Sequence, residues 1–151
     1  MPAPPTPPIG LHLASAARAV SRAFDEALGE AGGSMPVWLV LLNLKMRGQM
    51  ANQRELAAAV GIREATLTHH LNAMESDGLL TRRRDPGNRR VHVVELTQAG
   101  EAAFARLRDA ALAFDGRLRR GISAEELTGF EHVLTRLAAN VAPTDADRDV
   151  P

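Results

Sequence analysis

Several residue types are scarce or absent in this chain, and each absence excludes a class of function. Among 151 residues there is no cysteine, which excludes disulfides, thiolate metal sites and cysteine nucleophiles. Tyrosine is also absent and aromatic residues make up only 3% of the chain, so the core must consist mainly of Leu, Ala and Val, which favours helices. The formal net charge is zero, so any affinity for nucleic acid must come from a local basic patch.

Long apolar runs and a secretion signal are lacking as well. No apolar run approaches the roughly 18 residues of a transmembrane helix, and no basic segment followed by an apolar one stands at the N-terminus. We therefore expect a cytoplasmic protein. Residues 1–8 are rich in proline and residues 143–151 are polar and acidic, so both ends are predicted to be disordered.

Between these ends, apolar residues recur at helical spacing in several segments. One helix is predicted over residues 9–31, and a second, apolar nearly all round and therefore buried, over residues 37–47. Two more helices follow Thr97 and Ser123, and Ser123 forms a capping box with Glu126. The predicted fold class is mainly α with a small β-hairpin.

The central segment carries the clearest functional pattern. A short helix beginning at Asn52, a turn at Gly61 and a second helix over about residues 63–77 form a helix-turn-helix pattern. In the second helix, the apolar residues at helical spacing must face inward: Leu67, Leu71 and Met74. The outward face then presents hydroxyl, amide and imidazole groups, which suit the base edges of the DNA major groove. We expect base contacts from Thr66, Thr68, His69 and Asn72.

A basic hairpin follows. Two strands flank the turn signal at residues 85–88, and residues 82–90 hold five arginines against one aspartate. An isolated basic turn is more often simply solvated, but directly after a helix-turn-helix pattern, binding to a phosphate backbone or a narrow minor groove is favoured. We predict phosphate contacts from Arg63, Arg82, Arg83 and Arg84, and entry into the minor groove by Arg89 or Arg90.

The flanking helical segments, residues 9–33 and 98–142, carry more apolar surface than a small four-helix core would use. These helices could complete a monomeric core, but pairing with a second copy is the favoured interpretation. Two recognition helices, one from each copy and one turn of DNA apart, would then bind a palindromic site. The predicted organisation is a winged helix-turn-helix region, residues 36–97, between N- and C-terminal dimerisation helices.

A set of short motifs occurs in a single order along the chain: Glu55-Leu56-Ala57, Val60-Gly61-Ile62, Thr66-Leu67-Thr68, Glu75, Gly78-Leu79-Leu80, Arg82, Asp85-Pro86, Arg89-Arg90, Leu96-Thr97 and Gly100. In these motifs the chain resembles the MarR family of winged helix-turn-helix transcriptional regulators, over about residues 11–141. The resemblance implies a dimer with interlocking first and last two helices and a wing arginine in the minor groove. It also implies control of DNA binding by a small, often aromatic or phenolic, molecule lodged between the dimer helices and the reading domain.

Three residues depart from the family pattern. Arg63 stands where the family usually has Ser or Thr, which weakens the helix cap but could add a phosphate contact. His69 stands where the family often has Arg, so a contact there is expected to be weaker and pH-sensitive. Asn88 replaces the wing aspartate, so it can hold Arg90 only by a hydrogen bond and not by charge.

One histidine, His70, falls on the inward side of the second helix of the helix-turn-helix, the recognition helix. The favoured interpretation is a partly buried side chain bonded to the backbone. The alternative is that it lines an effector pocket, because a mixed apolar cleft with one or two polar groups is the usual form of a small-molecule site. Each candidate is more often a core residue when taken singly; together the pocket candidates are His12, Trp38, Leu42, Met46, His70 and Phe104.

No constellation for metal binding or catalysis stands out. The five histidines form no i, i+4 pair, so we expect neither a metal site nor a cofactor. No Ser-His-Asp spacing or phosphate-cradling Gly loop is present, so we do not expect an enzyme. The sequence predicts a transcriptional regulator, and a repressor is the favoured interpretation. It would bind a palindromic operator in double-stranded DNA as a homodimer and would be released by a small aromatic or phenolic ligand. The alternative is a winged-helix protein-interaction module that does not bind DNA.

Overall fold

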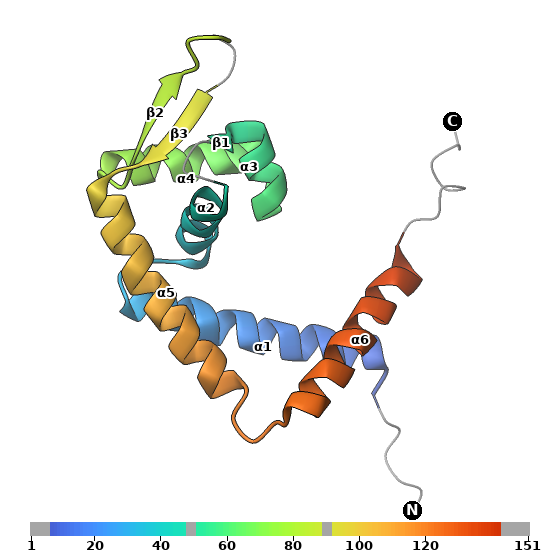
Figure 1. Cartoon of the computed structure of the whole chain (residues 1–151). Helices are drawn as coiled ribbons and strands as arrows, with labels where there is room; N and C mark the ends of the chain where they lie inside the picture. Colours follow the sequence, from blue (N-terminus) through green and yellow to red (C-terminus); the bar gives the residue numbers. More distant parts are fainter. Residues whose placement is uncertain (1–6, 48–50, 89–91, 143–151) are drawn as a thin grey trace, which may run out of the picture. The chain divides into compact units, whose positions relative to one another are not determined.

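The computed structural model describes residues 7–47, 51–88 and 92–142. The predicted disordered ends therefore lie outside the described residues, apart from positions 7 and 8. The chain divides into two compact units, Met1–Phe114 and Asp115–Pro151. The fold is mainly helical with a small antiparallel sheet, which confirms the predicted fold class. In chain order the elements are α1 (Ile9–Glu30), α2 (Met35–Met46), β1 (Ala51–Asn52), α3 (Gln53–Val60), α4 (Glu64–Ser76), β2 (Leu80–Arg84), β3 (His92–Leu96), α5 (Gln98–Leu118) and α6 (Ala124–Val141) (Figure 1).

Helix α2 forms the centre of the first unit and contacts α1, α3, α4 and β3. Ser34 caps it by accepting a hydrogen bond from the N–H of Val37 at 3.5 Å, and the proline in its first turn costs no hydrogen bond there. Its buried residues are Trp38, Val40, Leu41 and Leu44. The prediction of a buried helix is confirmed for this part of α2, but its last residue, Met46, is 78% exposed.

Helices α3 and α4 form the predicted helix-turn-helix. The Asn52 side chain caps α3 by accepting a hydrogen bond from the N–H of Arg54 at 2.9 Å. Gly61 ends α3 at φ 78°, a left-handed conformation that glycine adopts without steric cost. In α4 the three residues predicted to face inward are all buried: Leu67, Leu71 and Met74. In α3 the buried residues are Leu56 and Ala57.

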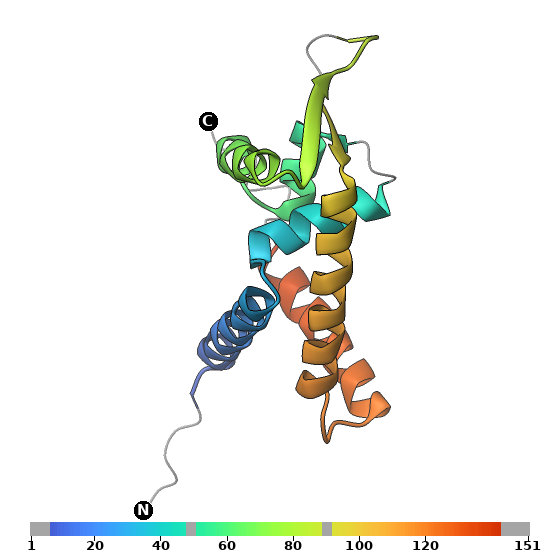
Figure 2. The same ribbon diagram turned by 90° about the vertical axis from the view of Figure 1, so that its left-hand side faces the viewer.

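Strands β2 and β3 form the predicted hairpin, which projects away from the helices of this unit (Figures 1 and 2). Its register pairs Leu80 with Leu96 and Arg84 with His92. The sheet has a third strand that the sequence did not predict, because β1 pairs with β3 through Ala51 and Val94. The strand order is β1-β3-β2, so the base of the wing is joined to the start of the helix-turn-helix.

Thr97 joins the wing to helix α5. Its hydroxyl oxygen accepts a hydrogen bond from the N–H of Gly100 at 3.1 Å, as expected of a helix cap, and its hydroxyl donates to the carbonyl of Gly78. Its own N–H donates to the carbonyl of Leu79 at 3.1 Å. Because a Cβ atom at position 100 would lie 1.9 Å from the Leu79 carbonyl oxygen, this junction requires glycine there.

Helix α1 packs on α2, and its Phe24 ring stacks on Phe114 of α5 with 4.9 Å between ring centroids. Several apolar residues of α1 remain outside this contact and are exposed: Ile9, Leu11 and Val20. Helix α1 therefore has an apolar surface that its own unit leaves uncovered.

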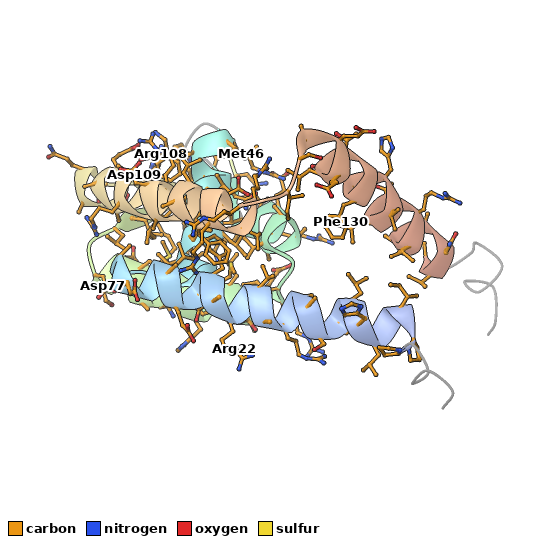
Figure 3. The ribbon with its side chains drawn as sticks, turned by 90° about the horizontal axis from the view of Figure 1, so that it is seen from below. Arg22, Met46, Asp77, Arg108, Asp109 and Phe130 are labelled. Atoms are coloured by element: carbon orange, nitrogen blue, oxygen red, sulfur yellow. The ribbon has the colours of Figure 1, made fainter. Side chains whose placement is uncertain are left out.

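Helix α6 belongs to the second unit. The predicted capping box is present: the Ser123 N–H donates to Glu126 at 2.8 Å, and the Ser123 hydroxyl accepts from the N–H of Glu126 at 3.1 Å. No residue of α6 is buried. Phe130, labelled in Figure 3, is 53% exposed and Val141 is 81% exposed. Among the described residues, no helix has both the length and the apolar character needed to cross a membrane.

Candidate nucleic-acid interface

The four residues predicted to contact bases all lie on α4, opposite the side buried in the core. Thr66, His69 and Asn72 are exposed, and Thr68 is half-buried. Arg63 precedes the helix, is exposed, and makes no side-chain capping bond, in agreement with the weak cap expected from its side chain. The arrangement gives α4 a polar outer face. Contacts between these residues and DNA remain a prediction.

Arg82 links the wing to α4. Its guanidinium donates to Glu75 Oε2 from Nη2 at 2.6 Å and from Nε at 3.1 Å, and its backbone N–H donates to Glu75 Oε1 at 3.2 Å. Nη2 also donates to the side-chain oxygen of Asn72. The Arg82 side chain is only 17% exposed, and its hydrogen bonds hold the pKa of Glu75 below the ordinary glutamate value. We predicted a phosphate contact for Arg82, but two of its three guanidinium nitrogens already have partners in the protein.

This network was not predicted from the sequence, although a signal for it exists. Glu75 and Arg82 are seven residues apart, on either side of Gly78, which has φ 74°. A tight left-handed turn between a helix and a strand brings the last turn of the helix next to the start of the strand. An acidic residue before such a turn and a basic residue after it therefore indicate an ion pair.

The two arginines that follow in β2 differ in their partners. Arg83 Nη2 forms an ion pair with Glu95 Oε1 of β3 at 2.9 Å, and this hydrogen bond raises the pKa of Arg83. Within the described ranges, no carboxylate pairs with Arg84 or with Arg63. The predicted minor-groove residues Arg89 and Arg90 lie outside the described residues, as does any contact between Asn88 and Arg90.

A polar hollow of about 690 Å³ lies beside α4. Its lining comes from the start of α3, the outer side of α4 and the first half of β2: Asn52, Gln53, Arg54, Glu64, Thr68, Glu75 and Arg82. Arg54 and Glu64 face each other across 4.0 Å at this surface. The hollow contains none of the six predicted pocket residues. In the part of the chain that the structure describes, no three histidine or carboxylate side chains are placed to hold a metal ion.

Two of the predicted pocket residues lie together in the core of the first unit. The ring of Trp38 stacks on Phe104, with centroids 5.7 Å apart and planes inclined by 13°. The ammonium of Lys45, a residue that sequence reasoning missed, lies 5.6 Å from the centre of the Phe104 ring. It also forms an ion pair with Glu101 at 2.9 Å. The result is an aromatic pair with a charged group over the Phe104 ring.

The other four predicted pocket residues are more dispersed. Leu42 is partly buried and packs against the hydrophobic core. His70 is half-buried and its ring lies 5.8 Å from that of His69. His12 and Met46 are exposed (Figure 3 labels Met46). A pocket formed by all six residues therefore stays a prediction.

Comparison with known proteins agrees with this geometry. A model of the MarR family matches residues 34–92, which span α2 to the start of β3. The crystal structure of the transcriptional regulator PA3341 is 33% identical, covers 89% of this chain and 98% of its own, and has a TM-score of 0.75. The transcriptional repressor CouR, solved bound to a 23-mer DNA duplex, is 28% identical over 87% of this chain and 92% of its own, with a TM-score of 0.78.

A third structure, a MarR-family transcriptional regulator from Rhodococcus sp. RHA1, is 25% identical over 86% of this chain and 91% of its own, with a TM-score of 0.75. The family model covers the helix-turn-helix and part of the wing, and the solved structures extend the likeness to the flanking helices. The chain therefore belongs to the MarR family of transcriptional regulators.

Proposed function

We propose that this protein is a homodimeric repressor that acts in the cytoplasm, binds a palindromic operator in double-stranded DNA and is released by a small aromatic or phenolic ligand. The observation that carries the proposal is the connection between α4 and the wing. Because Glu75 binds Arg82 through both side chain and backbone, the polar face of α4 and the basic hairpin form one continuous surface. Such a surface can place a helix in the major groove and a hairpin on the adjacent backbone.

The charges of this surface allow phosphate contacts in spite of the zero net charge. Arg63 and Arg84 are exposed, and the pair between Arg83 and Glu95 is a partly exposed surface ion pair. Exposed pairs contribute little free energy, about 0–1 kcal/mol, so a phosphate can compete with Glu95 for Arg83. We assign the minor-groove contact to Arg89 or Arg90. The DNA-bound state of CouR, which is 28% identical, supports DNA as the ligand.

The exposed apolar residues of the flanking helices support a dimer. On α1 these are Ile9, Leu11 and Val20, and on α6 they include Phe130, Val133 and Val141. Water-exposed apolar side chains repeated along each of these helices indicate surfaces that are buried in an assembly. We propose that a second copy of the chain covers them, because a palindromic site requires a two-fold symmetric protein.

The aromatic pair supports a ligand site of the proposed class. The flat rings of Trp38 and Phe104 would stack on an aromatic ligand. The ammonium of Lys45, 5.6 Å from the Phe104 ring, would favour a phenolate or carboxylate substituent. A ligand wedged at this pair would change the position of α2 and, through it, that of the recognition helices, which is how it would lower the affinity for DNA.

A protein-interaction module without DNA binding is the second candidate. The observation that favours it is the pairing of arginines at this surface, where Arg54, Arg82 and Arg83 all face carboxylates. In that case the surface would have little positive charge to offer DNA. The two candidates differ in whether wing arginines are needed for DNA binding.

Fluorescence anisotropy separates these candidates. An operator selected from a pool of random duplexes is titrated at several salt concentrations against the parent, the Arg89→Ala/Arg90→Ala variant and a control variant, Arg106→Ala/Arg108→Ala. The control makes the same change in charge on the exposed side of α5. A repressor should prefer its operator to scrambled DNA with a steep salt dependence, and only the wing variant should lose affinity, with a salt slope smaller by about two. Equal, weak binding to both DNAs would contradict the repressor proposal and favour the interaction module.

A further inference from the structure

The hydrogen bond between Arg82 and Asn72 fixes which atoms of the Asn72 amide face the outside. An asparagine amide has one accepting oxygen and one donating NH₂ group, and the two are usually free to exchange places. A guanidinium has only donors. Because Arg82 Nη2 lies in hydrogen-bonding contact with Asn72, the amide must turn its oxygen toward Arg82 and its NH₂ group away.

Arg82 is itself held in place. Glu75 accepts two hydrogen bonds from the guanidinium and one from the backbone N–H, and the Arg82 side chain is 17% exposed. A side chain tied at three points and largely covered has few alternative rotamers. The orientation that Arg82 imposes on the Asn72 amide is therefore a property of the folded protein before it meets any ligand.

We propose that Asn72 determines operator specificity as a hydrogen-bond donor and selects guanine or thymine, the bases with a keto oxygen, on the strand that it faces, with Arg82 as the positioning residue that fixes this polarity. The proposal rests on the proposed function, in which α4 enters the major groove. Guanine presents two acceptors there and thymine one, whereas cytosine presents a donor and adenine a donor beside an acceptor. An asparagine that reads adenine does so with both amide atoms. At position 72 the oxygen is already bonded to Arg82, so this bidentate contact is disfavoured.

The experiment measures base preference rather than affinity alone. Duplexes derived from the selected operator carry each of the four base pairs at each position, with matching changes in both half-sites, and binding is followed by fluorescence anisotropy. At one position the wild type should prefer base pairs with guanine or thymine on one strand over the same pairs reversed by about tenfold, a discrimination of roughly 1.4 kcal/mol. Asn72→Ala should lose the discrimination at that position and keep it at every other position.

Asn72→Asp is the variant that tests most directly whether residue 72 acts as a donor. The carboxylate has the shape of the amide and can still accept from Arg82, but it has no donor to offer a base. Its preference at that position should therefore invert toward cytosine or adenine. Loss of affinity for all four base pairs in equal proportion would instead indicate simple repulsion between a carboxylate and DNA, and would overturn the proposal.

The role of Arg82 is tested by Arg82→Met, with Arg83→Met as its matched control. Both variants remove one guanidinium from β2 and keep an aliphatic side chain, but only Arg82 contacts Asn72. Arg82→Met should admit adenine at the position that Asn72 reads, because the amide can then turn and use both atoms. Arg83→Met should weaken binding to all sequences alike. Circular dichroism of both variants tests whether they fold, and the Asn72 variants test the donor polarity independently.

The outcomes distinguish failure of the role inferred for Asn72 from failure of the proposed DNA-binding function. Specific operator binding in which Asn72→Ala changes no base preference, or in which Asn72→Asp does not invert one, overturns the inference and leaves the proposed function intact. An unchanged preference in Arg82→Met also overturns the role of Arg82. If the wild type binds selected and scrambled duplexes equally, the proposed function is wrong, and the inference falls with it.

Discussion

Replacing Gly100 by alanine tests the junction between the wing and helix α5. In an open helix this change would stabilise the protein by about 1 kcal/mol, because alanine is the better helix former. Here the added Cβ would lie 1.9 Å from the carbonyl oxygen of Leu79, whereas real contacts of a Cβ essentially never fall below 3.0 Å. Backbone must therefore move by more than about 1 Å. The carbonyl that has to move also accepts the N–H of Thr97 at 3.1 Å.

The expected cost follows from these terms. Overpacking against backbone costs about 1–3 kcal/mol, and weakening the Thr97 hydrogen bond adds about 1 kcal/mol. After subtraction of the helix preference, Gly100→Ala should lower the free energy of unfolding by about 1–3 kcal/mol. With the urea dependence typical of a small protein, the unfolding midpoint should fall by about 1 M.

The matched control is Gly116→Ala in the same helix. No described heavy atom lies within 4 Å of a Cβ placed at position 116, so this variant should unfold at the parent's midpoint or slightly above it. Urea unfolding is followed by circular dichroism at two protein concentrations, which accounts for any contribution from dimerisation. If Gly100→Ala is as stable as the parent while Gly116→Ala behaves as expected, the close approach of α5 to Leu79 is wrong.

Three further predictions concern stability. Ser123→Ala should lower the free energy of unfolding by about 1 kcal/mol, because it removes the hydroxyl that accepts the Glu126 N–H; an unchanged thermal midpoint would contradict the importance of this cap. Leu41→Ala should cost about 2–5 kcal/mol in urea unfolding, since Leu41 is fully buried in α2, and a loss under 1 kcal/mol would mean that the core closes over the gap. Because Arg82 lowers the pKa of Glu75 in the folded state, this pair stabilises the protein at neutral pH and ceases to do so as the pH falls below the ordinary glutamate value of about 4.3. Thermal unfolding of Glu75→Gln should accordingly depend less on pH in that range than that of the parent.

Local signals in the sequence were sufficient for most of the fold. Helical spacing of apolar residues predicted α1, α2 and α4, and the capping box at Ser123 and Glu126 gave the start of α6. These features depend on neighbours within a few residues, which is what a single sequence records well. Strand β1 was missed because two residues carry no periodicity, and it exists only because β3 lies beside it.

The candidate site was predicted in composition but not in its internal contacts. The sequence analysis assigned Asn72 and the wing arginines to DNA binding, yet it gave Arg82, Arg83 and Arg84 the same role. The structure distinguishes these three arginines. Arg82 is bonded to Glu75, Arg83 is paired across the hairpin with Glu95, and Arg84 has no carboxylate partner among the described residues. This distinction depends on register and on the turn at Gly78, which bring together residues that are seven and twelve positions apart.

Zero net charge and specific DNA binding are compatible once these contacts are considered together. A neutral chain gains little from long-range attraction to any DNA, so its non-specific affinity should be low. Arginines that already have carboxylate partners reduce this affinity further, because each phosphate contact must replace an ion pair rather than only water. Contacts to base edges do not carry that cost when their donors are held in place beforehand, as the amide of Asn72 is by Arg82. A surface of this kind should gain a larger share of its binding free energy from contacts to base edges than a uniformly basic surface does. Its ratio of operator affinity to scrambled-DNA affinity should therefore be high at low salt.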